Sequence, residues 1–255
     1  MAAEGSLVLT PGALQTPFAE AFRALRANLS VNVGEAGVRS LLVTSGGVGE
    51  GKSTTAANLA ILMAQAGRRV ILVDADFRRP SLSRMFPTSH KFLPPQFSPP
   101  PLAGEGQGGG QVGRPEPLGL ADLVLQTALY AQACQPVPGI DNLYLVPTGA
   151  IPSNPAELLA SARMRATIAN LTEHADVVLL DSPPCSLYAD AVELTRVADG
   201  LLYVVRAGPQ GTHDHQRILK QLQRSRARLI GVVMNQVDGV IGNYRYRRPD
   251  GHHDG

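Results

Sequence analysis

The chain has 255 residues, of which 44% are hydrophobic and 17% charged, a composition typical of a soluble α/β protein with a sizeable core. Lysine and arginine number 23 against 21 acidic residues, and a net charge of +2 argues against nucleic acid as a main partner. Two cysteines exclude a disulfide framework, no apolar run reaches the roughly 18 residues of a membrane span, and the first residues lack a signal-peptide pattern. We therefore expect a cytoplasmic protein that reaches a membrane only through a partner.

The first periodic segment covers residues 17–30 and predicts an amphipathic helix. The apolar residues at helical spacing are Phe18, Phe22, Leu25 and Leu29. The charged residues of another face are Glu20, Arg23 and Arg26. Spacing alone favours a solvated face, with a Glu–Arg pair that contributes only about 0.2–0.5 kcal/mol.

A glycine-rich segment follows an apolar run and precedes a helical one. It matches the phosphate-loop (P-loop) pattern G-x-x-x-x-G-K-[ST] from Gly46 to Ser53. Glycines let backbone N–H groups close around a polyphosphate, and the helix N-terminus adds partial positive charge. Lys52 would reach the β- and γ-phosphates, and the Ser53 hydroxyl would ligate Mg²⁺. The predicted nucleotide-binding residues here are Gly46, Gly47, Gly49, Glu50, Gly51, Lys52, Ser53 and Thr54.

Apolar, mostly β-branched runs alternate with helical stretches along the chain, as expected of strands that are covered on both faces. The predicted strands are residues 41–43, 70–73, 143–146, 177–180, 201–205 and 229–234. Alternation predicts a mostly parallel sheet with right-handed crossovers and helices on both faces, an α/β P-loop NTPase fold. One helix start is well marked, because Asn154 is a natural N-cap, Pro155 suits the first position and Glu157 can reach back to the cap.

Residues 87–117 interrupt this alternation with eight prolines and six glycines. Such a segment has little to bury, so we predict a surface insertion in an otherwise single domain over residues 1–255. A proline-rich docking site is the functional alternative. Residues 239–255 lack apolar periodicity and predict a mobile tail.

Three carboxylates follow predicted strands. Asp74 and Asp76 end one strand, and Asp181 ends another. Ligands of open α/β sheets bind at the carboxyl ends of the strands, so these side chains are expected beside the phosphate loop. Asp181 and Asp74 are the predicted metal carboxylates, and Asp76 the general base. The alternative gives Asp74 and Asp76 only turn or capping roles.

Together with the phosphate loop, V-D-A-D-F-R-R-P from Val73 and L-L-D-S-P-P from Leu179 resemble the bacterial tyrosine kinases of capsule and exopolysaccharide export. Further matches are E-A-F-R-A-L-R-A-N-L, G-L-A-D-L-V-L, P-T-G-A-I-P-S-N-P-A-E-L-L, D-A-V-E-L-T-R-V-A-D-G and G-V-V-M-N-Q-V-D. The resemblance covers nearly the whole chain outside residues 87–117 and the two ends, and without a membrane span the chain resembles the separate-kinase type.

The resemblance implies an ATP- and Mg²⁺-dependent tyrosine kinase in which Lys52, Asp74 and Asp76 are catalytic. It assigns the charged face of the first helix to contacts that close a ring of subunits, which overrides the solvated interpretation. It also implies a membrane adaptor that recruits the kinase to the inner face of the plasma membrane, and protein tyrosine substrates. Family members usually end in a tyrosine cluster; here only Tyr244 and Tyr246 stand in the tail as candidate phosphoacceptors.

Two other functions share this pattern. A partition or division-site ATPase would carry a lysine just after the first loop glycine, where this chain has Gly47. A nucleotide-gated assembly factor would form the ring without transferring phosphate to tyrosine. Asn235 begins the sequence N-Q-V-D, which weakly resembles the guanine-binding motif N-K-x-D of GTPases but lacks its lysine. We predict instead that Asn235 contacts adenine.

Overall fold

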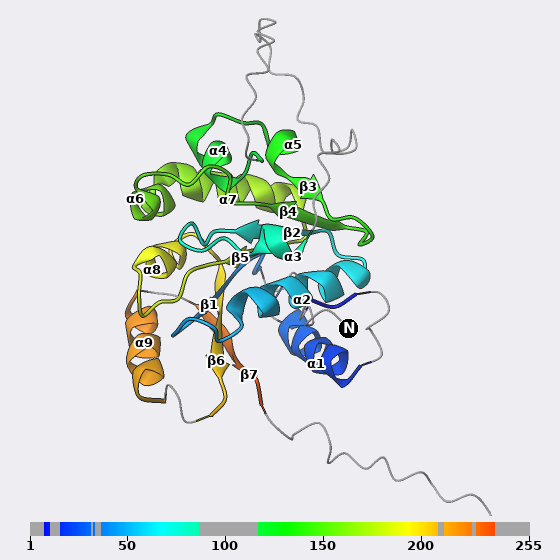
Figure 1. Ribbon diagram of the computed structural model, residues 1–255, viewed down its shortest axis with the longest axis vertical. Helices are drawn as coiled ribbons and strands as arrows, with labels where there is room; N and C mark the ends of the chain where they lie inside the picture. Colours follow the sequence, from blue (N-terminus) through cyan, green and yellow to red (C-terminus); the bar gives the residue numbers. More distant parts are fainter. Residues whose placement is uncertain are drawn as a thin grey trace, which may run out of the picture.

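The computed structural model describes residues 8–10, 16–31, 33, 37–86, 117–208, 212–225 and 228–237. In this part of the chain the strands form one sheet in the order β3-β4-β2-β5-β1-β6-β7 (Figure 1). The strands are β1 Ser40–Ser45, β2 Val70–Asp74, β3 Gln135–Pro136, β4 Leu143–Val146, β5 Val177–Asp181, β6 Gly200–Arg206 and β7 Leu229–Asn235. All pairs are parallel except β3 with β4, which confirms the predicted sheet.

Helices cover both faces of the sheet, as the alternation predicts (Figure 1). The helices are α1 Pro17–Ser30, α2 Lys52–Gln65, α3 Leu82–Met85, α4 Leu120–Leu125, α5 Tyr130–Ala133, α6 Pro155–Ala160, α7 Ala162–His174, α8 Asp190–Leu194 and α9 Thr212–Arg224. Helices α1 and α2 pack on one face, and α4, α7 and α9 contribute to the core of the other.

Strand residues divide between these two cores because successive side chains of a strand point to opposite faces. In β1, Leu41 and Val43 join the core under α1 and α2, whereas Leu42 joins the opposite one. Every residue of β1, β2, β4 and β5 is buried. The apolar residues that make up most of these strands therefore reflect cover on both faces.

Helix α1 has the predicted amphipathic form. The Thr16 hydroxyl accepts a hydrogen bond from the Ala19 N–H and caps the helix, with Pro17 at its start. Phe22 and Leu29 are buried against the core. The apolar face of α1 is thereby fixed on the same core as α2, the helix that follows the phosphate loop.

Two local features differ from the sequence prediction. The short antiparallel strand β3 was not predicted, because a Gln-Pro pair has no strand-like pattern. At α6, Asn154 is the N-cap and Pro155 the first residue, but Glu157 accepts from the Asn154 side-chain amide at 3.1 Å rather than from the cap backbone. Residues 87–116 and 238–255, which include most of the proline-rich segment and the whole predicted tail, lie outside the described residues.

None of the helices in the described ranges combines the length and the apolarity that a bilayer crossing requires.

Gly119, at the start of α4, is predicted to be essential for stability. A Cβ atom there would overlap the backbone of Pro147 and Gly149, which cannot move without disturbing the chain after β4. We expect Gly119→Ala to cost about 1–3 kcal/mol of unfolding free energy in denaturant titrations. Gly231→Ala is the control, because its nearest neighbour would be a Leu202 methyl group at 3.7 Å. Equal stability of the two variants would contradict this packing.

Candidate active site

The order of the strands brings three chain segments together at one edge of the sheet. Strand β5 lies between β1 and β2, with Asp181 paired to Val43 on one side and to Asp74 on the other. The phosphate loop follows β1, and the Asp76 loop follows β2. Because these strands are parallel, both loops and Asp181 meet at their carboxyl ends, where open α/β sheets bind ligands.

The phosphate loop ends in the first turn of α2. Gly49 and Gly51 have φ values of 79° and 90°, the left-handed region that glycine adopts without strain. Gly51 is the N-cap of α2, and no side chain caps the N–H groups of that helix. Free N–H groups at the start of a 14-residue helix favour an anion at this position.

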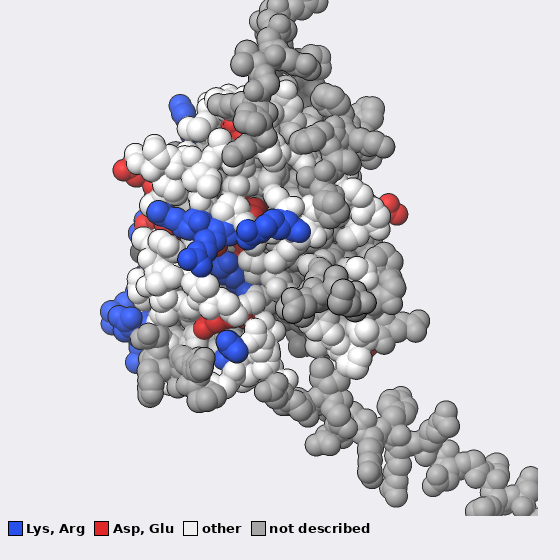
Figure 2. All heavy atoms as spheres, in the orientation of Figure 1, with Lys and Arg blue, Asp and Glu red and all other residues white. Residues whose placement is uncertain are grey.

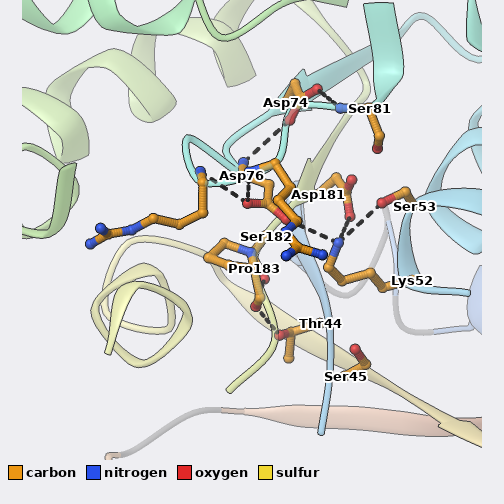
Figure 3. A network of polar contacts seen from close by, with 12 residues as sticks. Thr44, Ser45, Lys52, Ser53, Asp74, Asp76, Ser81, Asp181, Ser182 and Pro183 are labelled. Atoms are coloured by element: carbon orange, nitrogen blue, oxygen red, sulfur yellow. Dashed lines mark hydrogen bonds and ion pairs between the residues drawn. The ribbon is translucent and has the colours of Figure 1, made fainter. Parts of the chain in front are cut away.

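Lys52 is the central charge of the site (Figure 3). Its Nζ lies 3.1 Å from Oδ2 of Asp76 and 3.9 Å from Oδ1 of Asp181, and it donates to the Ser53 hydroxyl at 3.2 Å. The side chain is 14% exposed. Burial lowers the pKa of Lys52, but Asp181 and Asp76 outweigh burial and raise it above its usual value. The ammonium therefore stays charged.

Asp76 has a different partner on each carboxylate oxygen. Oδ2 faces Lys52, while Oδ1 accepts from the backbone N–H groups of Arg78 at 3.1 Å and Arg79 at 2.9 Å. These two bonds hold the loop around the carboxylate and leave Oδ2 facing Lys52.

Asp181 is fully buried, and neither of its oxygens has a hydrogen-bond partner among the described residues. Burial raises the pKa of Asp181 to about 7; Lys52 opposes the rise and Asp74 adds to it. A carboxylate in this position fits a divalent cation, which would supply the missing charge. Like Asp181, Ser53 lies next to the Lys52 ammonium, and its hydroxyl offers a further oxygen ligand (Figure 3).

The described residues contain no group of three or more His, Cys, Asp or Glu side chains arranged to hold a metal ion by themselves. Mg²⁺ differs from zinc in this respect, because it is usually bound by one or two carboxylates with water and substrate phosphates. Asp181 and Ser53 fit that pattern.

Asp74 is also buried, but its oxygens are already hydrogen-bonded. Oδ2 accepts from the N–H groups of Ser81 and Leu82, each at 3.0 Å, and Oδ1 from that of Asp76 at 3.3 Å. Burial raises the pKa of Asp74 to about 6, against the lowering effect of these bonds. Asp74 thus holds the loop that carries Asp76, the capping role weighed from the sequence. Its predicted role at the metal stays a prediction.

Asn235, at the end of β7, donates from its side-chain amide to the Glu50 carbonyl of the phosphate loop at 2.9 Å. The same amide fills the space in which a Cβ of Gly51 would stand. A cavity of about 730 Å³ opens here, with walls from the phosphate loop, the end of β7 and the apolar face of α1. Asn235 and Thr54 line it, so the predicted adenine contact is at a suitable place but remains untested.

Sequence reasoning missed the contacts that join the segment after β5 to β1, the strand that precedes the phosphate loop. The Thr44 hydroxyl donates to the Pro183 carbonyl at 3.0 Å (Figure 3). The Ser182 hydroxyl donates to the Val43 carbonyl at 3.2 Å. The sequence signal for these contacts was the presence of small polar residues just before the phosphate loop and directly after Asp181.

A second missed contact lies beside the Asp76 loop. Arg78 pairs with the buried carboxylate of Asp190 at 3.0 Å and lies over the Tyr188 ring at 4.9 Å. Lysine and arginine side chains gather across the middle of the face seen in Figure 2, with few acidic side chains visible there. Such a face attracts polyphosphate.

The predicted oligomerisation residues sit together on α1. Arg23 forms an exposed ion pair with Glu20, and Arg26 donates to the Leu62 carbonyl at 3.5 Å. Tyr244 and Tyr246 lie outside the described residues.

Asp181 makes the stability of the nucleotide-free protein depend on pH. Its pKa rises from 3.8 to about 7 on folding, so the folded protein retains a proton that the unfolded chain releases within this window. The free energy of unfolding contributed by this group is complete below about pH 4 and is lost as pH rises through about 7.

We therefore expect Asp181→Asn, which mimics the protonated carboxyl, to raise the melting temperature at pH 8 by a few degrees and to change little at pH 4. About 1 kcal/mol shifts the melting temperature of a protein of this size by roughly 2–4 °C. Asp141→Asn, at an exposed carboxylate, is the control. A lower melting temperature for Asp181→Asn at pH 8 would contradict the assignment.

Comparison with known proteins agrees with this geometry. A family model for the CobQ/CobB/MinD/ParA nucleotide binding domain matches residues 41–245. The tyrosine-protein kinase YwqD of Bacillus subtilis (strain 168) is 32% identical over 216 residues, which cover 85% of this chain and 80% of that relative.

Among solved structures, the chimerical protein CapA2B2 is similar with a TM-score of 0.76 and 26% identity, over 92% of this chain and 91% of that one. The septum site-determining protein MinD of Pyrococcus horikoshii OT3, complexed with Mg-ADP, shares the fold with a TM-score of 0.57 and 20% identity, over 77% of this chain and 69% of its own. The chain therefore belongs to the CobQ/CobB/MinD/ParA nucleotide-binding family and, within it, to the bacterial tyrosine kinases.

Proposed function

We propose that this protein is an ATP-dependent tyrosine autokinase that regulates capsular or exopolysaccharide synthesis and export. The observation that carries the proposal is the position of Lys52, beside a phosphate loop and between the Asp76 and Asp181 carboxylates. A lysine held there can exchange a carboxylate for a phosphate, and in doing so it uncovers a base.

Nucleotide binding is the first step. ATP brings its phosphates to the loop N–H groups and to Lys52, whose ammonium turns from Asp76 toward the β- and γ-phosphates. Oδ2 of Asp76 then faces the site without its counter-ion, while Oδ1 stays bound to the N–H groups of Arg78 and Arg79. The movement of Lys52 that accompanies ATP binding therefore also frees Asp76 to act as a base.

The magnesium ion would be held by Asp181 and Ser53 together with phosphate oxygens, with Asp74 supporting the site. When bound, it neutralises charge on the transferred phosphoryl group. The raised pKa of Asp181 means that metal binding displaces a proton from this carboxyl near neutral pH.

Transfer needs an acceptor oxygen in line with the γ-phosphate. A tyrosine hydroxyl has a pKa near about 10, so it is protonated at neutral pH and gains from a nearby base. As the bond from the tyrosine oxygen to the γ-phosphorus forms, the bond from that phosphorus to the β–γ bridging oxygen breaks. Asp76 takes the phenolic proton, and ADP leaves.

The acceptors are Tyr244 and Tyr246, modified between subunits of a homo-oligomeric ring. The ring is joined through the charged face of α1, which carries Glu20, Arg23 and Arg26 and can pair with charged side chains of a neighbouring subunit. A membrane adaptor of the polysaccharide co-polymerase type recruits the ring to the inner face of the plasma membrane. Named relatives support this setting, because they include tyrosine-protein kinases of the CpsD and EpsB types.

The test of this function is incubation of the purified protein with Mg²⁺ and ATP, followed by mapping of phosphosites by mass spectrometry. We expect phosphotyrosine at Tyr244 and Tyr246 in the wild type and none in Lys52→Met. The Lys52→Met protein should fold, because Asp181 can take up a proton when its cationic neighbour is lost. Phosphotyrosine formed by a folded Lys52→Met protein at the wild-type rate would defeat the proposal.

Asp76→Asn should separate chemistry from binding. The amide oxygen can still accept from Arg78 and Arg79, but the side chain no longer acts as a base. We expect Mg-ATP affinity close to wild type in calorimetry and a transfer rate lower by about 100-fold or more. Asp176→Asn, at a surface ion pair with Arg69, is the matched control. Loss of affinity together with turnover would assign Asp76 to binding instead.

Arg23→Ala combined with Arg26→Ala is expected to give monomers that still bind ATP. In the structure Arg23 pairs with Glu20 of the same helix, and Arg26 donates to the Leu62 carbonyl of α2. Light scattering measures the mass, and Arg68→Ala, which removes an exposed charge after α2, is the control. An oligomeric wild type with a double variant of unchanged mass would rule out this contact.

A further inference from the structure

A second polar cluster lies against the phosphate loop, apart from Lys52 and the carboxylates. His215 of α9 has its Nδ1 3.0 Å from the hydroxyl of Tyr203 in β6. Its Nε2 lies 3.3 Å from Oε1 of Glu50 in the loop. The other carboxylate oxygen of Glu50 accepts from the Gly46 N–H at 2.9 Å. The cluster therefore links α9 and β6 to both ends of the loop.

This cluster is buried and closely packed. Tyr203 is fully buried, and the His215 and Glu50 side chains are only 12% and 8% exposed. A Cβ atom at Gly46 would lie 2.7 Å from both His215 Nδ1 and the Tyr203 hydroxyl. Glycine at the first position of the motif thus admits these two side chains as well as the phosphates.

The carboxylate of Glu50 opposes the binding of polyphosphate by the loop. Its side chain brings a negative charge among N–H groups that are arranged for anions, and each added phosphate charge would be repelled by it. The nearby Cys185 thiol does not help, because burial raises its pKa to about 11 and leaves it neutral. The side chain that faces the other oxygen of Glu50, Oε1, is the ring of His215, at 3.3 Å.

The geometry gives that ring a defined orientation. When the Tyr203 hydroxyl donates to Nδ1, the proton of a neutral imidazole stands on Nε2, which faces the Glu50 carboxylate. A protonated ring forms an ion pair with the same oxygen. Either form turns the Glu50 charge toward the protein body.

We propose that His215 is a positioning residue for nucleotide binding: it holds and compensates the Glu50 carboxylate, so that the phosphate loop stays open to anions. The inference rests on the nucleotide site alone, because it concerns affinity for a nucleoside diphosphate or triphosphate and not the transfer to tyrosine.

The test is calorimetric titration of the full-length protein with ADP and Mg²⁺, which needs no kinase activity. His215→Ala should weaken binding by roughly fivefold to tenfold, because the Glu50 charge beside the phosphates then loses the ring that faces it at 3.3 Å. Gln216→Ala, at the exposed neighbour on α9, should bind like wild type. Adding Glu50→Gln to His215→Ala should restore affinity to within about twofold, because the charge that needed compensation is gone.

If His215 were only structural, adding Glu50→Gln to His215→Ala would leave the loss of ADP affinity unchanged or enlarge it. That result would overturn the proposal. So would a His215→Ala protein with wild-type affinity. Glu50→Gln alone gives a test that does not depend on the folding of His215→Ala, since glutamine can still accept from Gly46. It should bind ADP more tightly than wild type, because the loop loses a negative charge that repels phosphates, and unchanged or weaker binding would overturn the proposal.

Discussion

The site depends on the buried positive charge of Lys52, which the carboxylates of Asp76 and Asp181 share. Lys52 lies among carboxylates at 3.1 and 3.9 Å and is largely shielded from water. Removing such a charge from water costs several kcal/mol unless it is paired, and the same holds for Asp181. In the absence of nucleotide, the Lys52 ammonium offsets the free-energy cost of burying these carboxylates. In the proposed mechanism it leaves them when phosphates and a divalent cation balance the charge, and occupancy of the site is thereby coupled to exposure of Asp76.

The fold makes this arrangement possible through strand order. Because β5 lies between β1 and β2, Asp181 stands between the phosphate loop and the Asp76 loop, although the three segments are far apart in sequence. The septum site-determining protein MinD shares this fold at a TM-score of 0.57, and the chimerical protein CapA2B2 shares it at 0.76. A shared fold does not fix the chemistry. Gly47, where a partition ATPase would carry lysine, is one local difference.

Much of the fold was predictable, because buried parallel strands are apolar throughout and the phosphate loop has a fixed spacing. The positions of Lys52, Asp76 and Asp181 beside one another were predictable on the same grounds, and their roles stay predictions. The roles of other residues were not predictable, since they depend on contacts across the fold. Asn235 bonds to Glu50 over 185 positions, and His215 meets Glu50 from another helix. In the case of Asp74, the pattern located the carboxylate but did not show that three backbone N–H groups already occupy it.

The exchange of partners by Lys52 is the central claim, and a crystal structure with Mg²⁺ and a non-hydrolysable ATP analogue tests it most directly. The account predicts Nζ of Lys52 at hydrogen-bonding distance from phosphate oxygens and more than about 4 Å from Asp76, beyond ion-pair range. Oδ1 of Asp76 should keep its bonds to the N–H groups of Arg78 and Arg79, with Oδ2 facing the γ-phosphate side. A bound analogue with Lys52 still paired to Asp76 would contradict it.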